Sequence, residues 1–437
     1  LTVRGGGGIF GGGSPDVYIG NSFSNTGVIN TSITARQTDG GVYQLNGTAN
    51  ASAGAILNNP SFTTVPAAAD VAVQAAAAGL SSNPNATTSL NAIDPNFKAP
   101  NQYRGTLSVD YNANLGALGD GWRFGADLLY SKVREQVMVV DLRSVPVPGS
   151  FTPDGRQRYT SAIGNAGDTG QDLLLTNTKY GRGWIGVLRA EKSWDWGLTL
   201  GGAYTYQDVR DAGALTSSQA GSIYGNGANY DANFGGRGHS NDEVRWAFRY
   251  NASFERAFFG DYKTRLDIFG TTRAGAPYSY TMQDLSGGRS GVFGTAGSAL
   301  RYLFYVPTGI NDPLVTYAPT VVNGVTTLTA AQAAQRIDDI IESSGLKNYR
   351  GQIAPRNAFR SKAFTRIDLH VEQELPLPLG ARFSLFADVE NFTNLLNHKW
   401  GQQLRSSFPF RKVVAKVSCA NTACTQYKYQ EPSSDTV

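Results

Sequence analysis

The residues of this chain best suited to chemistry are two pairs of carboxylates near its C-terminal end. Asp368 and Glu372 stand four positions apart, and Asp388 and Glu390 stand two positions apart. Two facing carboxylates could serve as the acid and the base of glycoside hydrolysis. Arg366 lies beside the first pair, however, and the surrounding residues alternate strictly between polar and apolar types. The pattern therefore favours a network of charges on the polar face of a sheet over a catalytic site.

The other residue types that carry chemistry are sparse. None of His239, His370 and His398 has a second histidine or a cysteine at metal-ligand spacing, and His370 is expected to be a solvated residue. The segment from Gly6 to Gly11 matches G-x-G-x-x-G, but a dinucleotide site needs a helix that begins there, and Gly-Gly-Ser-Pro follows. A glycine-rich strand is the better interpretation. No G-x-S-x-G is present, so we expect no enzyme, no cofactor and no metal site.

The two cysteines, Cys419 and Cys424, are five positions apart. Four intervening residues are enough to turn the chain and bring the two Cα atoms within disulfide range. The spacing predicts a disulfide in an oxidising compartment. Two free thiols are the alternative.

Aromatic residues cluster in the connecting segments as well as in the strands. Tyr278 and Tyr280 form one such motif, and Tyr302 and Tyr305 form another. These tyrosines could contact a ligand or pack a loop, and the sequence leaves both interpretations open.

The charged pairs lie in segments with a two-residue period. In 364–375 the apolar residues occupy odd positions and the charged residues even ones, and 382–391 continues the pattern after a short turn. Successive side chains of a strand point to opposite faces. A sheet with one apolar and one charged face is typical of the boundary between lipid and water in an outer-membrane β-barrel.

The same period predicts nine long strands. They cover residues 1–10, 103–112, 122–139, 183–192, 198–210, 243–258, 262–272, 364–375 and 382–391. The connections at 115–121, 194–197, 259–261 and 376–381 are short, and those at 11–100, 143–178, 212–241, 275–362 and 396–437 are long. We expect the short turns at one rim and the long loops at the other. The long loops should contain helices at 66–78 and 330–344, and Thr329 with Gln332 forms a capping box at the start of the second.

Aromatic residues are expected to form an interfacial girdle beside the short turns. The residues assigned to it are Trp122, Trp184, Trp194, Trp196, Phe258, Phe259 and Tyr262.

The alternation also assigns side chains to the two faces. Those predicted to face lipid are Trp246, Phe248, Tyr250, Leu266, Ile268, Leu369, Val371, Leu385 and Val389. Those predicted to face a lumen are Arg249, Asn251, Asp267, Arg366, Asp368, His370, Asp388 and Glu390. An arginine facing lipid near the midplane costs roughly 2–4 kcal/mol, which motivates the assignment.

The composition also agrees with a protein made mostly of β-strands. Only 16% of the residues are charged, against roughly 25% in soluble domains, and the chain holds 51 glycines and 11% aromatic residues. No apolar segment approaches the ~20 residues of a membrane-spanning helix. The formal net charge of +4 gives no indication of nucleic-acid binding.

Several segments resemble the Oar-like branch of the TonB-dependent outer-membrane receptors. They are Leu1–Phe10, Ser24–Gly27, Gly275–Tyr280, Leu303–Gly309 with Asp312–Pro313, and the residues Arg366–Leu369 with Phe386–Phe392, the last of which is shared across TonB-dependent receptors generally.

The resemblance implies part of a 22-stranded antiparallel barrel in the Gram-negative outer membrane, normally filled by an N-terminal plug. Residues 1–437 are expected to be the C-terminal barrel portion, without the plug and the final strand. The implied function is active transport, in which extracellular loops bind an unknown ligand and an inner-membrane TonB complex supplies energy through the missing N-terminal part. A chain of nine strands is not expected to close such a barrel by itself.

Two rival interpretations remain at this point. A passive porin or adhesin-type barrel would have the same wall without energy coupling. A soluble β-rich protein that binds or hydrolyses carbohydrate would not need a membrane. The resemblance names no transported ligand.

Overall fold

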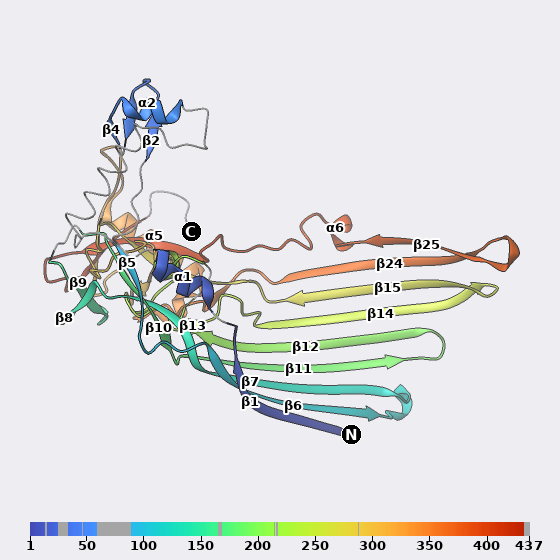
Figure 1. Cartoon of the computed structure of the whole chain (residues 1–437). Coiled ribbons are helices and arrows are strands. Elements are labelled where there is room, and N and C mark those ends of the chain that lie inside the picture. The colour runs from blue at the N-terminus through green and yellow to red at the C-terminus, as the bar shows by residue number, and fades with distance from the viewer. Residues whose placement is uncertain are drawn as a thin grey trace.

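The protein is mostly antiparallel β-sheet, as the alternation predicts. The computed structural model describes residues 1–13, 15–24, 34–45, 47–58, 89–164, 168–213, 215, 217–286 and 288–431. Figure 1 shows two parts, a broad sheet of long strands and a compact unit of shorter elements at one end of it. The helix expected at 66–78 lies outside the described residues. No helix in the described ranges is both long enough and apolar enough to cross a membrane.

The sheet, which we call the wall, contains the nine predicted strands. Each pairs with its neighbours in an antiparallel register, and their order across the wall equals their order along the chain. They are β1 (Thr2–Gly11), β6 (Asn101–Ala113), β7 (Trp122–Asp141), β11 (Gly181–Ser193), β12 (Leu198–Asp211), β14 (Trp246–Phe259), β15 (Tyr262–Arg273), β24 (Phe364–Pro376) and β25 (Arg382–Val389). Within the described residues β1 and β25 do not pair with each other, so the wall is an open sheet.

The short turns lie together at one end of the wall and the long connections at the other, which confirms the predicted sidedness (Figure 1). Two of the turns contain the 3-10 helices η1 (Gly116–Leu118) and η3 (Pro378–Gly380). Gly197 closes the turn between β11 and β12 at φ 102°, and an added Cβ there would collide with the carbonyl oxygen of Glu255. Glycine is therefore required at this turn.

The described parts of 141–178, 212–241, 274–362 and 411–431 form the compact unit, which we call the cap. Its strands are β8 (Ser144–Phe151), β9 (Gln157–Ser161), β16 (Pro277–Asp284), β17 (Tyr302–Leu303), β18 (Tyr305–Val306), β19 (Val315–Tyr317), β20 (Thr320–Val322), β21 (Val325–Leu328), β22 (Gln352–Ile353), β23 (Phe359–Arg360), β26 (Arg411–Cys419) and β27 (Tyr427–Gln430). The strands β10 (Asp172–Thr178) and β13 (Gly238–His239) lie in the same segments but pair with β7 and β12 of the wall. Its helices are α4 (Ala220–Asn226), α5 (Ala330–Ser343) and η2 (Gly345–Tyr349).

The cap has a hydrophobic core of its own. β26 lies parallel to β16 and antiparallel to β27, which brings the C-terminal segment into the centre of the cap. Phe304, Val306 and Val414 are completely buried there. Helix α5 packs Ile337 and Ile341 against the same core, and the predicted capping box at its N-terminus is present.

The remaining elements are short. They are α1 (Asp16–Ser24), β2 (Ala35–Gln37), β3 (Tyr43–Leu45), β4 (Thr48–Ala49), α2 (Ser52–Leu57), β5 (Leu90–Ile93) and α6 (Thr393–Leu396).

Aromatic rings form a continuous series at the turn end of the wall. The Trp122 and Trp194 ring centroids lie 6.1 Å apart, and those of Trp194 and Trp196 lie 6.2 Å apart. The assignment of Trp184 to this end is wrong, since Trp184 lies near the start of β11, at the cap end, with its ring 4.3 Å from that of Tyr130. Aromatic residues therefore lie at both ends of β11, whereas the sequence predicted them beside the short turns alone.

Candidate functional site

The register of the strands shows which side chains share a face of the wall. Residues directly opposite each other on paired strands point to the same side. Phe248 faces Tyr204 and Thr272, whereas Arg249 faces Ala203 and Thr271. The two predicted sets of side chains accordingly lie on opposite faces. We call these the apolar face and the polar face.

Both faces of the wall are accessible to solvent in the single chain. They differ in the types of side chain that they carry. On the apolar face large side chains are uncovered, with Leu188 62% and Leu385 60% exposed. Monomeric soluble proteins rarely leave a contiguous apolar surface of this kind open. Exposed apolar surfaces of this kind mark sites of contact with lipid or with another protein.

The polar face holds all seven charged residues predicted from the sequence. Arg366 donates to Asp368 at 2.8 Å and to Glu390 at 3.1 Å. His370 and Asp388 form a hydrogen bond of 2.6 Å between Nδ1 and Oδ1. Asp267 accepts from Arg265 at 2.7 Å, and Arg249 is the remaining member of the set. The carboxylates that resemble a hydrolase pair are thus already bound by Arg366 and His370.

A row of arginines crosses this face. The residues aligned by the pairing are Asp110, Gly125, Arg189, Ala203, Arg249, Thr271 and Arg366. Each arginine is separated from the next by one small or hydroxyl residue. Neighbouring strands lie ~4.8 Å apart, so successive arginines stand about 10 Å apart across the wall. The small residues leave grooves between the guanidinium groups.

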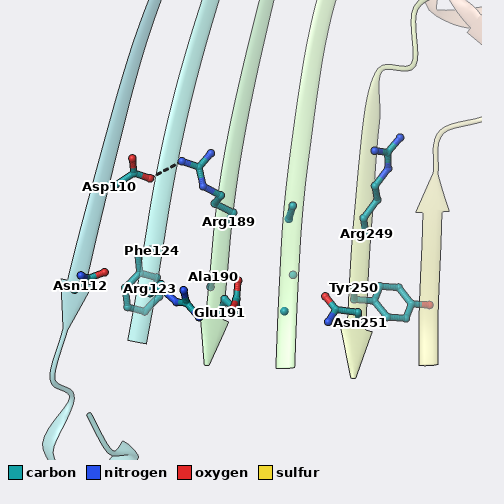
Figure 2. A pocket seen from close by; sticks show the side chains of 13 residues that line it. Asp110, Asn112, Arg123, Phe124, Arg189, Ala190, Glu191, Arg249, Tyr250 and Asn251 are labelled. Atoms are coloured by element: carbon teal, nitrogen blue, oxygen red, sulfur yellow. Dashed lines mark hydrogen bonds and ion pairs between the residues drawn. The ribbon is translucent and has the colours of Figure 1, made fainter. Parts of the chain in front are cut away.

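Two grooves meet at Arg249. One, of about 460 Å³, extends toward β6 and is lined by Arg123, Arg189 and Asn251 among others. The second, of about 550 Å³, extends toward β24 and is lined by Arg273 and Arg366 among others. Figure 2 shows the first groove, with Arg189 joined to Asp110 and Arg249 extending from β14 without such a partner. Polar, charged walls of this kind suit water and solutes with charged groups.

The residues of the row on β6, β7 and β11 are not among those predicted from the sequence. Asp110 and Arg189 lie at polar positions of strands that the alternation predicts, and this pattern could have assigned them to the polar face. Their proximity, 2.5 Å between Arg189 and Asp110, depends on the register of strands that are not adjacent in the wall. Alternation within one strand does not contain that information.

One group of possible metal ligands occurs among the described residues. Donor atoms of Asp208, His239 and Glu243 lie within 4.8 Å of one another. Arg245 donates to Asp208 at 3.1 Å, and Arg360 forms an ion pair with Glu243. Burial alone would raise the pKa of Glu243, but hydrogen bonds from His239 and the Val209 N–H outweigh it and hold that pKa below its usual value. The carboxylates are therefore satisfied by cations of the chain, and the group does not favour a divalent ion.

The four tyrosines that the sequence left open belong to the cap. Tyr280, Tyr302 and Tyr305 are at most 5% exposed, and Tyr278 packs against the same core. Tyr302 stacks on Phe293 with the ring centroids 4.1 Å apart. This placement supports the packing interpretation for Tyr280, Tyr302 and Tyr305, whereas Tyr278 is only partly buried.

The structure joins Cys419 and Cys424 in a disulfide, as the spacing predicts. Cys419 ends β26, and Cys424 is buried against the cap core. The disulfide therefore holds the turn that leads from β26 to β27.

No protein-family model matches this chain, and no curated protein matches it significantly.

Proposed function

We propose that this chain is the C-terminal wall portion of a Gram-negative outer-membrane receptor that transports a ligand actively with energy from a TonB complex. In this proposal the apolar face contacts outer-membrane lipid, the polar face lines the lumen, and the cap lies outside the cell, where it binds the ligand. The chain catalyses no reaction. The observation that carries the proposal is the opposite composition of the two faces of the wall.

The dimensions of the apolar face support a membrane location. Trp184 and Trp194 bound it on β11, ten positions apart. At ~3.3 Å per residue this is about 33 Å along the strand. With the ~35–45° tilt of barrel strands it corresponds to roughly 25 Å of height, which matches the apolar band of an outer-membrane barrel. Short turns at one end and long loops at the other also suit such a barrel.

Energy coupling rests on the resemblance of the segments that lie in β1, β16, β24 and β25 to the Oar-like receptors. The wall by itself would suit a passive porin equally, because a polar lumen serves both. A folded, disulfide-linked cap would also suit an adhesin. These alternatives differ from the proposal in whether the lumen is permanently open and whether TonB binds.

The test uses the full-length protein expressed in its native outer membrane and purified in detergent. We expect it in the urea-washed outer-membrane fraction, with no steady conductance in planar bilayers and with binding to the immobilised periplasmic domain of TonB. Stable open-channel conductance without TonB binding would favour the porin. Recovery in the soluble fraction would contradict every membrane interpretation.

A further inference from the structure

Two arginines in one groove of the polar face have no acidic partner. Arg249 and Arg273 make no side-chain hydrogen bond or ion pair within the described part of the chain, and the Cζ of Arg273 lies 5.6 Å from the centroid of the Phe364 ring. Most other arginines of this face pair with carboxylates. Arg123 pairs with Glu191 at 2.7 Å, and Arg189 pairs with both Asp110 and Asp127. Arg104 on β6 also lacks a carboxylate partner and lies over the Phe10 ring, but it does not line this groove.

Arg249 and Arg273 are close neighbours. Thr271 lies directly opposite Arg249, and Arg273 follows two positions later on β15, so the arginines occupy diagonal positions of one face. Such positions are ~7–8 Å apart, within reach of long side chains. Both arginines line the same groove of about 550 Å³. Two guanidinium groups can therefore approach a single solute from adjacent strands.

The lining of this groove is cationic. It contains Arg249, Arg273 and Arg366 against one carboxylate, that of Asp368, which is already bound to Arg366. Gln207 and Thr271 add polar groups that can donate hydrogen bonds to an anion. The planar fork of arginine matches the geometry of carboxylate and phosphate oxygens. Like charges held this close are destabilising unless an anion or water separates them.

The pair also stands where a solute would enter. Arg273 is the last residue of β15, and the chain continues from it into β16 of the cap. Arg249 lies near the first residue of β14, at the same end of the wall. In the proposed orientation this is the extracellular mouth of the lumen, beneath the cap.

We propose that Arg249 and Arg273 form a binding site for the anionic group, a phosphate or a carboxylate, of a solute that enters the lumen. This inference rests on the proposed function for the origin of the solute. The binding chemistry itself depends only on the two arginines and the groove. An acidic polypeptide segment that occupies the groove instead is an alternative outcome, and it would block the site to small anions.

The experiment measures binding of pyrophosphate and of citrate to the full-length purified protein by isothermal titration calorimetry at low salt. The two probes distinguish a phosphate from a carboxylate site. Arg249→Gln and Arg273→Gln should each weaken binding of the preferred probe about tenfold, the effect expected for loss of a charge-assisted hydrogen bond. The double variant should abolish measurable binding. Arg249→Lys should bind with intermediate affinity, since it keeps the charge and loses the fork.

Arg256→Gln is the matched control. Arg256 is an exposed arginine on the same strand β14, but it points to the opposite face near the turn end. Its replacement should leave binding within about twofold of the wild type, because it does not line the groove. Outer-membrane yield and heat-modifiable migration show that each variant is folded.

Three results would overturn the proposal: no saturable binding of either probe by the wild-type protein, unchanged binding by the double variant, or equal loss in Arg256→Gln. Failure of the proposed function has a different signature. A protein that does not bind TonB but binds the probes through both arginines would refute energy coupling and leave the anion site intact.

Discussion

In the wall each long strand pairs with the long strands before and after it in the chain, whereas in the cap β16 pairs with β26, which lies far along the sequence. The side chains differ accordingly. Leu188 on the apolar face of the wall is 62% exposed, while Phe304 in the cap is fully buried. The cap can therefore be stable through its own core. The wall instead has two unpaired edges, β1 and β25, within the described residues and an exposed apolar face, which lipid covers in the proposed function.

The cap also contains a carboxylate that is buried between two buried guanidinium groups. Asp168 lies between two arginines, with 3.2 Å to Arg143 Nη1 and 3.2 Å to Arg289 Nη2, and all three side chains are at most 4% exposed. The Ser161 hydroxyl donates to the same carboxylate at 2.8 Å. Burial alone would raise the pKa of Asp168, but these partners hold it below its usual value. Removal of one member of this group would therefore leave a buried charge without its partner in the cap.

The largest effect is expected for Asp168→Asn, which removes the charge between two buried guanidinium groups. Breaking a buried ion pair costs about 3–5 kcal/mol. Hydrogen exchange of β8 and β9 in the full-length protein should report the lost stability of the cap. Glu342→Gln is the control, because Glu342 is 56% exposed in its pair with Arg350, and its loss should cost less than about 1 kcal/mol. Equal effects of the two changes would contradict the difference between buried and exposed pairs.

The second effect tests the two faces of the wall. Leu188→Arg should cost about 2–4 kcal/mol if Leu188 faces lipid near the midplane. Val187→Arg, on the adjacent residue, places the same side chain on the polar face opposite Thr205 and Asp127 and should be tolerated. Urea unfolding in lipid vesicles measures both variants. If both are tolerated equally, the apolar face does not contact lipid.

A smaller effect is expected for the double change Cys419→Ser and Cys424→Ser in the cap. The two Cα atoms are 4.7 Å apart, and the loop that the disulfide closes is short. Such a loop restricts the unfolded chain little, so the loss should be ~1–2 kcal/mol at most. Assembly of the wall should not change. Thiol labelling of the native protein before and after reduction checks the pairing, and two reactive thiols before reduction would disprove it.

The smallest effect concerns pH. Asp312 in the cap accepts hydrogen bonds from the Thr308 N–H at 2.7 Å and the Leu314 N–H at 2.8 Å. Burial alone would raise the pKa of Asp312, but these hydrogen bonds outweigh it and lower the pKa below its ordinary 3.8. A lowered folded-state pKa stabilises the cap above the unfolded-state pKa, and this stability is lost as pH falls through the folded value.

Cap stability should therefore decline below about pH 4. Asp312→Asn should show a shallower decline in the same range, because it has no carboxylate to protonate. Thermal unfolding followed between neutral pH and pH 3 measures both proteins. Parallel pH profiles would show that Asp312 does not contribute.

The sequence alone was sufficient for the features that depend on near neighbours. Two-residue alternation identified the nine strands and the membership of the two faces, because strand geometry repeats every two residues. The spacing of Cys419 and Cys424 predicted their disulfide, and Thr329 with Gln332 predicted the start of α5. Each of these signals lies within a few positions of the chain.

Only the tertiary structure decided what depends on register and on contacts between distant segments. The pairing of β14 with β15 makes Arg249 and Arg273 diagonal neighbours, and the insertion of β26 beside β16 buries the tyrosines of the cap. Trp184 was misplaced even though the predicted strand 183–192 already puts it at the end away from the turn at 194–197, and the structure confirms that position. Alternation assigns a side chain to a face, but it contains no information on which residue of another strand lies opposite, since that is set by packing across the whole sheet.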